Sequence, residues 1–288
     1  MSEKKITKLN RLNDVFFKAL LGSEERKALT LNFINAILHR EGDQIFTNLI
    51  FASQELIPPR DKGKRCQVDV IAQMNDKSRV HIEVQVIADL CMANRTLYYW
   101  CHLYGRELGS GEPYQHLRPV ITIDLLNYNQ FKEYEDYAHS YHIANDRTHD
   151  ILTDHLEIHF IELKKIHISD IKQMKRGERW LAYFSPNYSD KEREVLAMSD
   201  NAIKEAMQYE KKFESDNKLI SAYWDYEKSL RDYNSDVLGN KQLGFNEGTD
   251  ALSELIQILL KEKRLDEVDR VTKDKEYRKK MLEEYNLL

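Results

Sequence analysis

Residues 66–86 hold two stretches of alternating apolar and polar side chains, and this alternation restricts the fold more than any other feature of the sequence. A period of two residues is typical of β-strands that have one apolar face. The apolar rows consist of Cys66, Val68, Val70 and Ala72 in the first stretch and Val80, Ile82, Val84 and Val86 in the second. Residues 75–78, with the sequence Asn-Asp-Lys-Ser, have the composition of a turn. The segment therefore predicts a β-hairpin.

The pairing of the two apolar rows decides which polar residues of the hairpin meet. If both rows share a face, a three-residue turn places Asp69 opposite Glu83 or Gln85, with the other one as a diagonal neighbour. Directly opposed Cβ atoms in a sheet lie roughly 5 Å apart. Two carboxylates and an amide would then converge, and oxygen ligands of this kind suit Mg²⁺ or Mn²⁺. A surface hairpin with a solvated polar face is the alternative that the pattern leaves open.

The composition predicts a soluble protein of a reducing compartment. The 288 residues suffice for one large domain or two smaller ones. Cys66, Cys91 and Cys101 show no paired spacing, which fits a cytoplasmic protein and offers no zinc site. The sequence has no apolar run near the roughly 18–20 residues of a membrane helix, and its first residues hold no apolar signal core. A net charge of −5 neither indicates nor excludes binding to nucleic acid, because local patches matter more than the total.

The rest of the first half predicts a mixed α/β fold. We expect helices at residues 15–22, 24–38 and 89–108, and strands at residues 45–53, 66–73, 80–86, 119–127 and 156–163. Either Asn13 or Asp14 is suited to cap the first helix. In the helix at residues 89–108, the spacing assigns Leu97, Trp100 and Cys101 to the buried side and places Arg95 and Tyr99 together on another face.

From residue 166 onward the sequence predicts helices alone. The expected domains are residues 1–185 for the α/β domain, 186–240 for a helical connector and 241–288 for a small helical module. Residues 232–248, which contain three glycines, favour a linker or bend.

The C-terminal module is expected to need a packing partner. An apolar stripe at its start is too wide for a lone helix, and the two segments that follow are too short to be stable alone. The stripe consists of Leu252, Leu255, Ile256, Leu259 and Leu260. We expect the module to dock on the α/β domain or on another subunit, which would give a homodimer. A helix-turn-helix-like DNA reader is the alternative, with Lys273, Lys275, Arg278, Lys279 and Lys280 as phosphate contacts.

A basic loop at residues 60–65 leads directly into the strand of Asp69. Lys62, Lys64 and Arg65 lie in this loop, and cationic side chains of this kind hold the phosphates of a nucleic-acid backbone. A solvated loop without a ligand is the alternative.

Together these segments resemble the PD-(D/E)XK nuclease superfamily, and within it the bacterial recombination-promoting nucleases, which are often labelled putative transposases. The resemblance rests on six segments: NDVFFKALLG at 13–22, FINAIL at 33–38, VDVIAQ at 68–73, IEVQ at 82–85, NRTLYYW at 94–100 and GEPYQHLRPVITI at 111–123. Their order and spacing agree over roughly the first 165 residues.

The resemblance implies a restriction-endonuclease-like core, in which helices flank a mixed central sheet, and a metal-dependent DNA endonuclease that uses Mg²⁺ or Mn²⁺. Asp69 and Glu83 match the two motif carboxylates and would bind the metal. Gln85 stands where the superfamily more often has lysine, and Asp14 matches an acidic position of the first helix that joins the site. The DNA-phosphate contacts would be Arg95, Tyr99, Lys62, Lys64 and Arg65.

Two other classes of protein remain open from the sequence. A DDE-type transposase needs a third carboxylate in a separate late segment and usually a basic DNA-binding domain, and the nearly charge-neutral tail speaks against it. A catalytically degenerate nuclease-fold module that binds DNA or protein is consistent with Gln85 in place of lysine. Such a module has no need of both Asp69 and Glu83.

Overall fold

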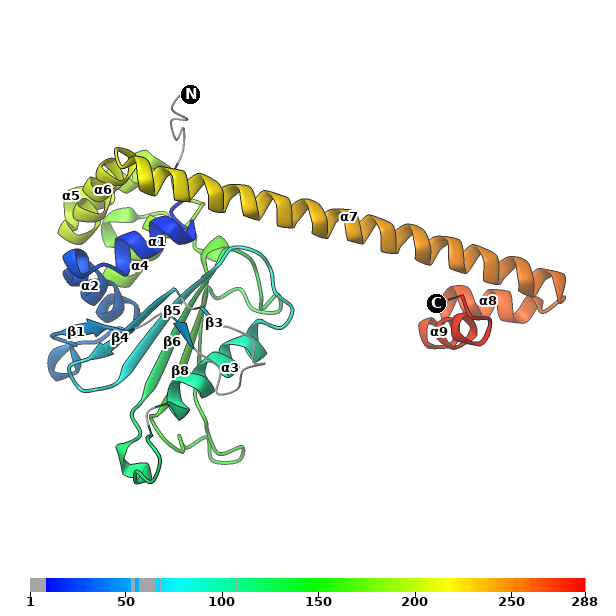
Figure 1. The fold of residues 1–288 in the computed structure, drawn as a ribbon, viewed down its shortest axis with the longest axis horizontal. Coiled ribbons are helices and arrows are strands. Elements are labelled where there is room, and N and C mark those ends of the chain that lie inside the picture. The colour runs from blue at the N-terminus through cyan, green and yellow to red at the C-terminus, as the bar shows by residue number, and fades with distance from the viewer. Residues whose placement is uncertain (1–8, 53–54, 57–65, 68, 107, 288) are drawn as a thin grey trace. The chain divides into compact units, whose positions relative to one another are not determined.

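A six-stranded mixed sheet forms the centre of the first part of the chain (Figure 1). The structure is a computed structural model that describes residues 9–52, 55–56, 66–67, 69–106 and 108–287. The strand order is β1-β4-β5-β6-β8-β7. The strands are β1 (Leu49–Phe51), β4 (Val70–Met74), β5 (Arg79–Gln85), β6 (Val120–Leu126), β7 (Ala138–Tyr141) and β8 (Leu156–Glu162). β5, β6 and β8 run parallel and the other neighbours antiparallel, which makes the sheet mixed as the α/β prediction requires.

The predicted hairpin is present as β4 and β5. Its register pairs Val70 with Ile82, so the two apolar rows share a face. The connection has an odd number of residues, 75–77, closed by a 2.8 Å hydrogen bond from the Met74 N–H to the Ser78 carbonyl. Continuing this register by one residue places Asp69 opposite Glu83. The predicted strand at residues 66–73 is divided between β4 and β3 (Cys66–Gln67), which pairs separately with β2 (Glu55–Leu56).

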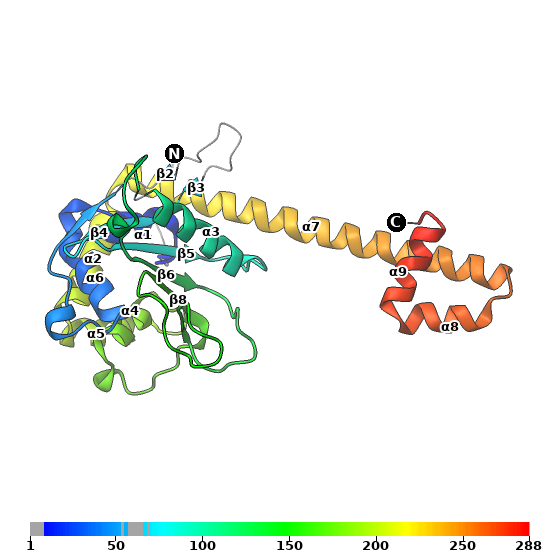
Figure 2. The same cartoon turned by 90° about the horizontal axis from the view of Figure 1, so that it is seen from below.

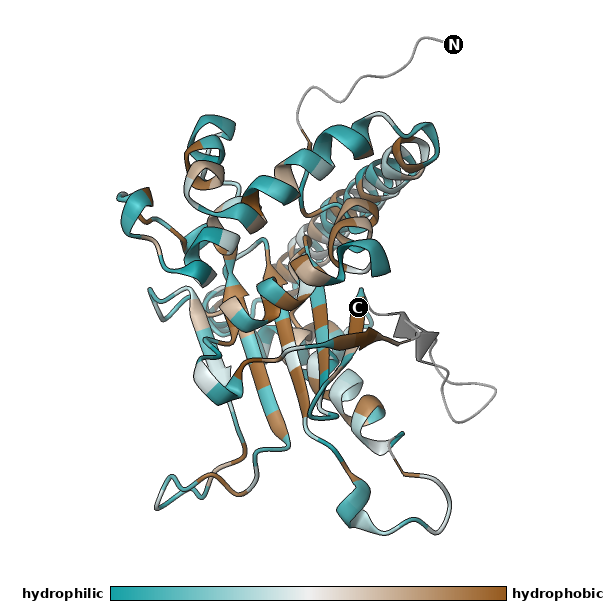
Figure 3. Cartoon of the chain, turned by 90° about the vertical axis from the view of Figure 1, so that its left-hand side faces the viewer, coloured by the Kyte–Doolittle hydropathy of each residue, from teal (hydrophilic) through white to brown (hydrophobic). Residues whose placement is uncertain are grey.

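Helices cover both faces of the sheet (Figures 1 and 2). On the face of the apolar rows lie α1 (Asp14–Leu21), α2 (Lys27–Ile37), α4 (Arg176–Phe184), α5 (Asp190–Ser199) and α6 (Asn201–Glu214). On the other face lies α3 (Met92–Gly105). Figure 3 shows apolar and polar residues alternating along the strands. The apolar residues pack against the helices on the two faces of the sheet. This architecture is an α/β, restriction-endonuclease-like fold.

Two sequence expectations for α3 were wrong. Leu97 and Cys101 are exposed, whereas Tyr99 and Leu103 are buried with Trp100. The side of the helix that packs on the sheet carries Thr96 and a row of large side chains. Helical periodicity alone did not determine how α3 is rotated about its own axis. The short strand β7 was not predicted, because it is polar and mostly exposed.

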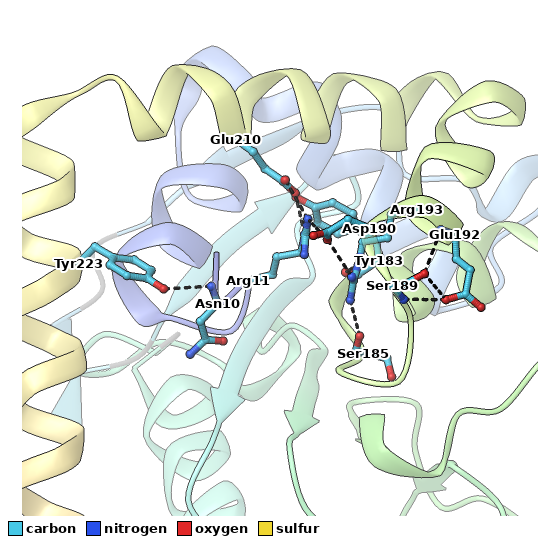
Figure 4. A network of polar contacts seen from close by, with 10 residues as sticks. All are labelled: Asn10, Arg11, Tyr183, Ser185, Ser189, Asp190, Glu192, Arg193, Glu210 and Tyr223. Carbon is cyan, nitrogen blue, oxygen red and sulfur yellow. Dashed lines mark hydrogen bonds and ion pairs between the residues drawn. The ribbon is translucent and has the colours of Figure 1, made fainter. Parts of the chain in front are cut away.

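A largely buried polar network joins Arg11, just before α1, to α5 and α6 (Figure 4). The Arg11 guanidinium donates to both carboxylate oxygens of Glu210, at 2.7 and 2.9 Å, and to Asp190 at 3.1 Å. Arg193 donates to the Tyr183 carbonyl at 2.8 Å. A two-pronged arginine–carboxylate pair fixes orientation as well as distance. The network therefore sets where α1 begins relative to α6.

The chain divides into two compact units, Met1–Tyr226 and Glu227–Leu288. In the second unit, the end of α7 (Asn217–Lys261) packs with α8 (Leu265–Lys273) and α9 (Lys275–Glu284). The buried side chains of this module are Leu255, Leu259, Val271, Met281 and Leu282. None of the helices in the described part of the chain has both the length and the apolar character needed to cross a lipid bilayer.

The bend predicted at residues 232–248 was wrong, because α7 is helical throughout that stretch. A glycine in a helix costs about 1 kcal/mol relative to alanine but does not forbid the helix. Packing of Tyr223 near one end of α7 and Leu255 near the other holds the helix on both sides of its glycines. The domain boundaries expected after residues 185 and 240 stay predictions, although α5 and α6 contribute to the core of the first unit.

Gly177 offers a test of how closely α4 approaches α2. A Cβ atom at this position would lie 2.6 Å from the Ala36 carbonyl oxygen, which belongs to the backbone and cannot rotate away. Gly177→Ala should lower the free energy of unfolding by about 1–3 kcal/mol, measured by urea denaturation. Gly239→Ala is the control, because a Cβ there meets nothing within 4 Å. It should change stability little or raise it by up to about 1 kcal/mol. Similar effects of the two substitutions would contradict the close approach.

Candidate active site

Three carboxylates lie in one row across neighbouring strands. The register of the parallel pair places Glu83 of β5 beside Asp124 of β6, and Asp69 directly precedes Val70, the first residue of β4, which pairs with Ile82 of β5. Residues paired across a sheet project from the same face. All three side chains are buried, and Glu83 and Asp124 contact residues of α3. The sheet therefore gathers acidic groups where one end of β4 meets the middle of β5 and β6.

Asp69 is held from two directions. Its Oδ2 accepts a 2.7 Å hydrogen bond from the Val84 N–H, and its Oδ1 lies 3.3 Å from the Lys18 ammonium. Lys18 also lies 2.8 Å from Asp14, one turn earlier in α1. Burial raises the pKa of Asp69 well above its usual range, and repulsion from Glu83 adds to this, whereas the Lys18 charge opposes it. The first helix, α1, thus places the carboxylate of Asp14 and the ammonium of Lys18 next to Asp69.

The Glu83 carboxylate has two unlike oxygens. Oε1 accepts a 2.5 Å bond from Arg95. Oε2 is buried, has no hydrogen-bond partner among the described residues and lies 3.5 Å from His81 Nε2. One oxygen of Glu83 is therefore engaged, and the other is available to a further ligand.

Arg95 connects several of the residues expected at the site. Its guanidinium donates to Gln85 Oε1 at 3.0 Å and to the Tyr99 hydroxyl at 3.2 Å, in addition to Glu83. The amide nitrogen of Gln85 donates to the Ile87 carbonyl at 3.0 Å. Both ends of the Gln85 amide are thus occupied, and the Tyr99 ring is buried beneath Arg95.

The structure brings most of the expected site residues together. They form two contact groups: Lys18 joins Asp14 to Asp69, and Arg95 contacts Glu83, Gln85 and Tyr99. Asp69 and Glu83 lie close enough for their carboxylates to repel each other. The expected phosphate contacts Lys62, Lys64 and Arg65 lie outside the described residues. Asp14 is the first residue of α1, and its neighbour Asn13 is the cap, accepting from the N–H groups of Val15 and Phe16. The alternative of Asp14 as a plain cap was therefore wrong.

Sequence reasoning missed Lys18, His81 and Asp124. Lys18 stands four residues after Asp14 on a helix, a spacing that places the two side chains side by side. Asp124 carries the one charge inside the apolar run 120–126, and a charge in a buried strand is itself a signal. Burial raises the pKa of Asp124 to about 7, although attraction to His81 and a 2.7 Å hydrogen bond from Thr96 act in the opposite direction.

The donor set fits a divalent cation at Asp69 and Glu83. Within the part of the chain that the structure describes, no three histidine, cysteine or acidic side chains are grouped so as to hold a metal by themselves. The two carboxylates nevertheless repel each other, and Glu83 keeps one buried oxygen without a hydrogen bond. A cation between them would relieve the repulsion and satisfy that oxygen. Backbone or water oxygens would have to complete the coordination.

Comparison with known proteins relates the chain to a nuclease family. The family model described as PD-(D/E)XK nuclease family transposase matches residues 11–240. No curated protein and no solved structure matches the chain. The matched range contains the whole carboxylate row together with Asp14, Lys18 and Arg95.

The raised pKa of Asp124 predicts a pH-dependent stability. The folded protein keeps this proton up to about pH 7, whereas the unfolded chain loses it near the ordinary value of 3.8. The contribution of Asp124 is therefore complete below this window and is lost as the pH rises through it. Asp124→Asn should make the decline in the free energy of unfolding shallower by on the order of 1 kcal/mol per pH unit.

Urea denaturation at several pH values within the window measures this slope. Asp154→Asn, at an exposed position on the same molecule, is the matched control and should leave the slope as it is in the parent. An unchanged slope in the Asp124 variant would mean that the carboxyl group titrates normally. His81, Glu83 and Arg95 are the charged or titratable neighbours that act on it.

Proposed function

The chain belongs to the PD-(D/E)XK nuclease family transposases, and from this membership we propose that it is a metal-dependent DNA endonuclease that hydrolyses phosphodiester bonds. The observation that carries the proposal is the buried pair Asp69 and Glu83, flanked by the cations Lys18 and Arg95. Acidic groups bind a divalent metal, and neighbouring cations bind the phosphate. The pair would work in the cytoplasm with Mg²⁺ or Mn²⁺, which prefer oxygen ligands.

Asp69 and Glu83 are the residues that would hold the metal. A bound divalent cation supplies a water of lowered pKa and stabilises the negative charge on the phosphoryl group. The chain's own part is to hold the two carboxylates in a fixed orientation. The Val84 N–H and Lys18 do this for Asp69, and Arg95 does it for Glu83.

Lys18 compensates for the lysine that is missing at position 85. Its ammonium reaches Asp69 from α1, so a positive charge stands next to the carboxylates although the strand itself supplies Gln85. We assign to Asp14 the role of holding this ammonium, at 2.8 Å. Gln85 then has a different task, since its amide oxygen positions Arg95.

Arg95 is the proposed phosphate contact within the described residues. Its side chain is 30 % exposed, which leaves part of the guanidinium accessible to a ligand while the rest contacts Glu83. Tyr99 acts through Arg95, because its buried hydroxyl accepts from the guanidinium. Lys62, Lys64 and Arg65 remain proposed DNA contacts on the strength of their charge in the loop before Asp69.

A catalytically degenerate binding module is the second candidate. Its supporting observation is that Lys18 and Arg95 already pair with the two carboxylates, so the charges are partly balanced without any metal. A protein that had lost catalysis would keep such pairs as structural contacts. Cleavage by the purified protein distinguishes the two candidates.

Substitution of the carboxylates tests the nuclease directly. Asp69→Ala and Glu83→Gln should each abolish Mg²⁺-dependent nicking of a supercoiled plasmid, because each removes one of the two proposed metal ligands. The Asp69 variant loses the hydrogen bond from Val84 but also a repulsive buried pair, so its stability should change little. Asp146→Ala, on the exposed surface, is the control and should cut at the parental rate. Parental cleavage by the Asp69 variant would refute the assignment.

We also propose that α7 associates with a second copy of the chain. The apolar stripe that the sequence offered for docking is covered within its own unit, since Leu255 and Leu259 are buried against α8 and α9. Every residue from 231 to 250 is exposed, however, including Leu238 and Phe245. An isolated helix rich in glycine is marginal in water, so this stretch needs a partner. Its acidic side chains outnumber its basic ones, which disfavours DNA as that partner.

The association predicts a specific effect on mass. Leu238 and Phe245 lie seven residues apart and therefore on one face of α7, so Leu238→Glu combined with Phe245→Glu should convert a dimer to a monomer in light scattering. Leu243→Glu is the matched control, because Leu243 is equally exposed but points to the opposite side of the helix. A parent that is already monomeric, or equal effects of both changes, would rule out this face. A loss of DNA affinity without a change in mass would favour a DNA-binding role instead.

A further inference from the structure

We propose that His81 is a positioning residue for Glu83, whose carboxylate it orients from the buried side of the site. The inference rests on the proposed function, because it explains how one of the two proposed metal ligands is kept in place. His81 and Glu83 are two residues apart in β5, so their side chains leave the same face of the sheet.

The geometry points to a contact between the two side chains. His81 is completely buried, and its Nε2 lies 3.5 Å from Glu83 Oε2. Neither ring nitrogen of His81 has a hydrogen-bond partner among the described residues, and the same is true of Glu83 Oε2. Buried polar atoms are nearly always hydrogen-bonded, so three adjacent exceptions require an explanation. A small adjustment that lets the Nε2–H donate to Oε2 satisfies two of them.

Glu83 needs this second contact because Arg95 alone does not fix its plane. Arg95 engages only Oε1, and the last torsion of a glutamate is broad, so a carboxylate held at one oxygen still rotates. Arg95 also comes from a different element, α3, and is partly exposed. A ligand for a metal must present its second oxygen in a fixed direction, which a partner on the same strand can set.

His81 is itself held rigidly. Tyr99 packs against its ring edge-on, with 6.1 Å between the ring centroids. On the neighbouring strand, the Asp124 carboxylate attracts the imidazole and accepts a 2.7 Å hydrogen bond from Thr96. Side chains of β6 and α3 thus stabilise the imidazole, and the imidazole in turn acts on Glu83. Tyr99, Asp124 and Thr96, the described residues that act on the imidazole, are all buried.

A purely structural histidine and a positioning histidine respond differently to substitution. Replacing His81 by an apolar residue removes two buried nitrogens that lack hydrogen bonds, so the fold should lose little stability or gain some. The same change leaves Glu83 Oε2 without its orienting neighbour, so metal binding should weaken. Opposite directions for stability and metal affinity are the signature of the positioning role.

The test uses the full chain without DNA. We expect His81→Leu to bind Mn²⁺ about 10–100-fold more weakly by calorimetry, the usual effect of removing a residue that orients a metal ligand, with an unchanged or higher Tm. His81→Phe serves as a second apolar variant. His81→Gln keeps an N–H donor and should recover part of the affinity. Thr122→Val is the matched control, because Thr122 lies opposite His81 in β6 and has a buried hydroxyl without a described partner. It should bind Mn²⁺ like the parent.

Crystal structures of the parent and of the leucine variant complete the test. We expect the Glu83 carboxylate to change its orientation in the variant while Arg95 stays in place. An unchanged Glu83, an unchanged Mn²⁺ affinity, or a lower Tm with parental affinity would overturn the proposal. If the parent binds no Mn²⁺, the metal chemistry of the proposed function fails, whereas the positioning role is then decided by the orientation of Glu83 in the two crystal structures.

Discussion

The register of the hairpin β4–β5 is the constraint on which the site depends. Because side chains alternate between the two faces of a strand, a shift by one residue would move Asp69 away from Glu83 and bring Val70 into its place. The loop at residues 75–77 and the hydrogen bond from the Val84 N–H to Asp69 both oppose such a shift. The same contact therefore secures the register and orients the first carboxylate.

A row of buried acidic side chains destabilises the fold, and the neighbouring cations offset part of this cost. Burial and mutual repulsion raise the pKa of Asp69, and burial does the same for Asp124. Lys18 from α1 and Arg95 from α3 approach the row from different helices. The sheet supplies the acids, and the helices on its two faces supply the opposing charges. Catalytic sites commonly hold groups with shifted pKa values in this way.

The sequence predicted which residues of the candidate site lie close together where the pattern was local. Alternation in residues 66–86 placed Asp69 opposite Glu83 or Gln85, and the family resemblance added Asp14 and Arg95. Lys18 and Asp124 were missed because their roles arise from packing between elements that lie far apart in the chain. The rotation of α3 was also misjudged, since tertiary contacts decide it. The continuity of α7 was misjudged because glycine lowers helix propensity without forbidding the helix.

The multiple contacts of Arg95 have a consequence for how the two proposed ligands would affect each other's binding. Its guanidinium N–H groups are shared among Glu83, Gln85 and Tyr99. A phosphate that draws the guanidinium away uncovers Glu83 Oε1, and a cation that neutralises Glu83 loosens the guanidinium. Each ligand therefore lowers the free-energy cost of binding the other, and thermodynamic linkage makes this coupling equal in both directions. In the proposed nuclease, a metal and a polyanion would therefore favour each other's binding.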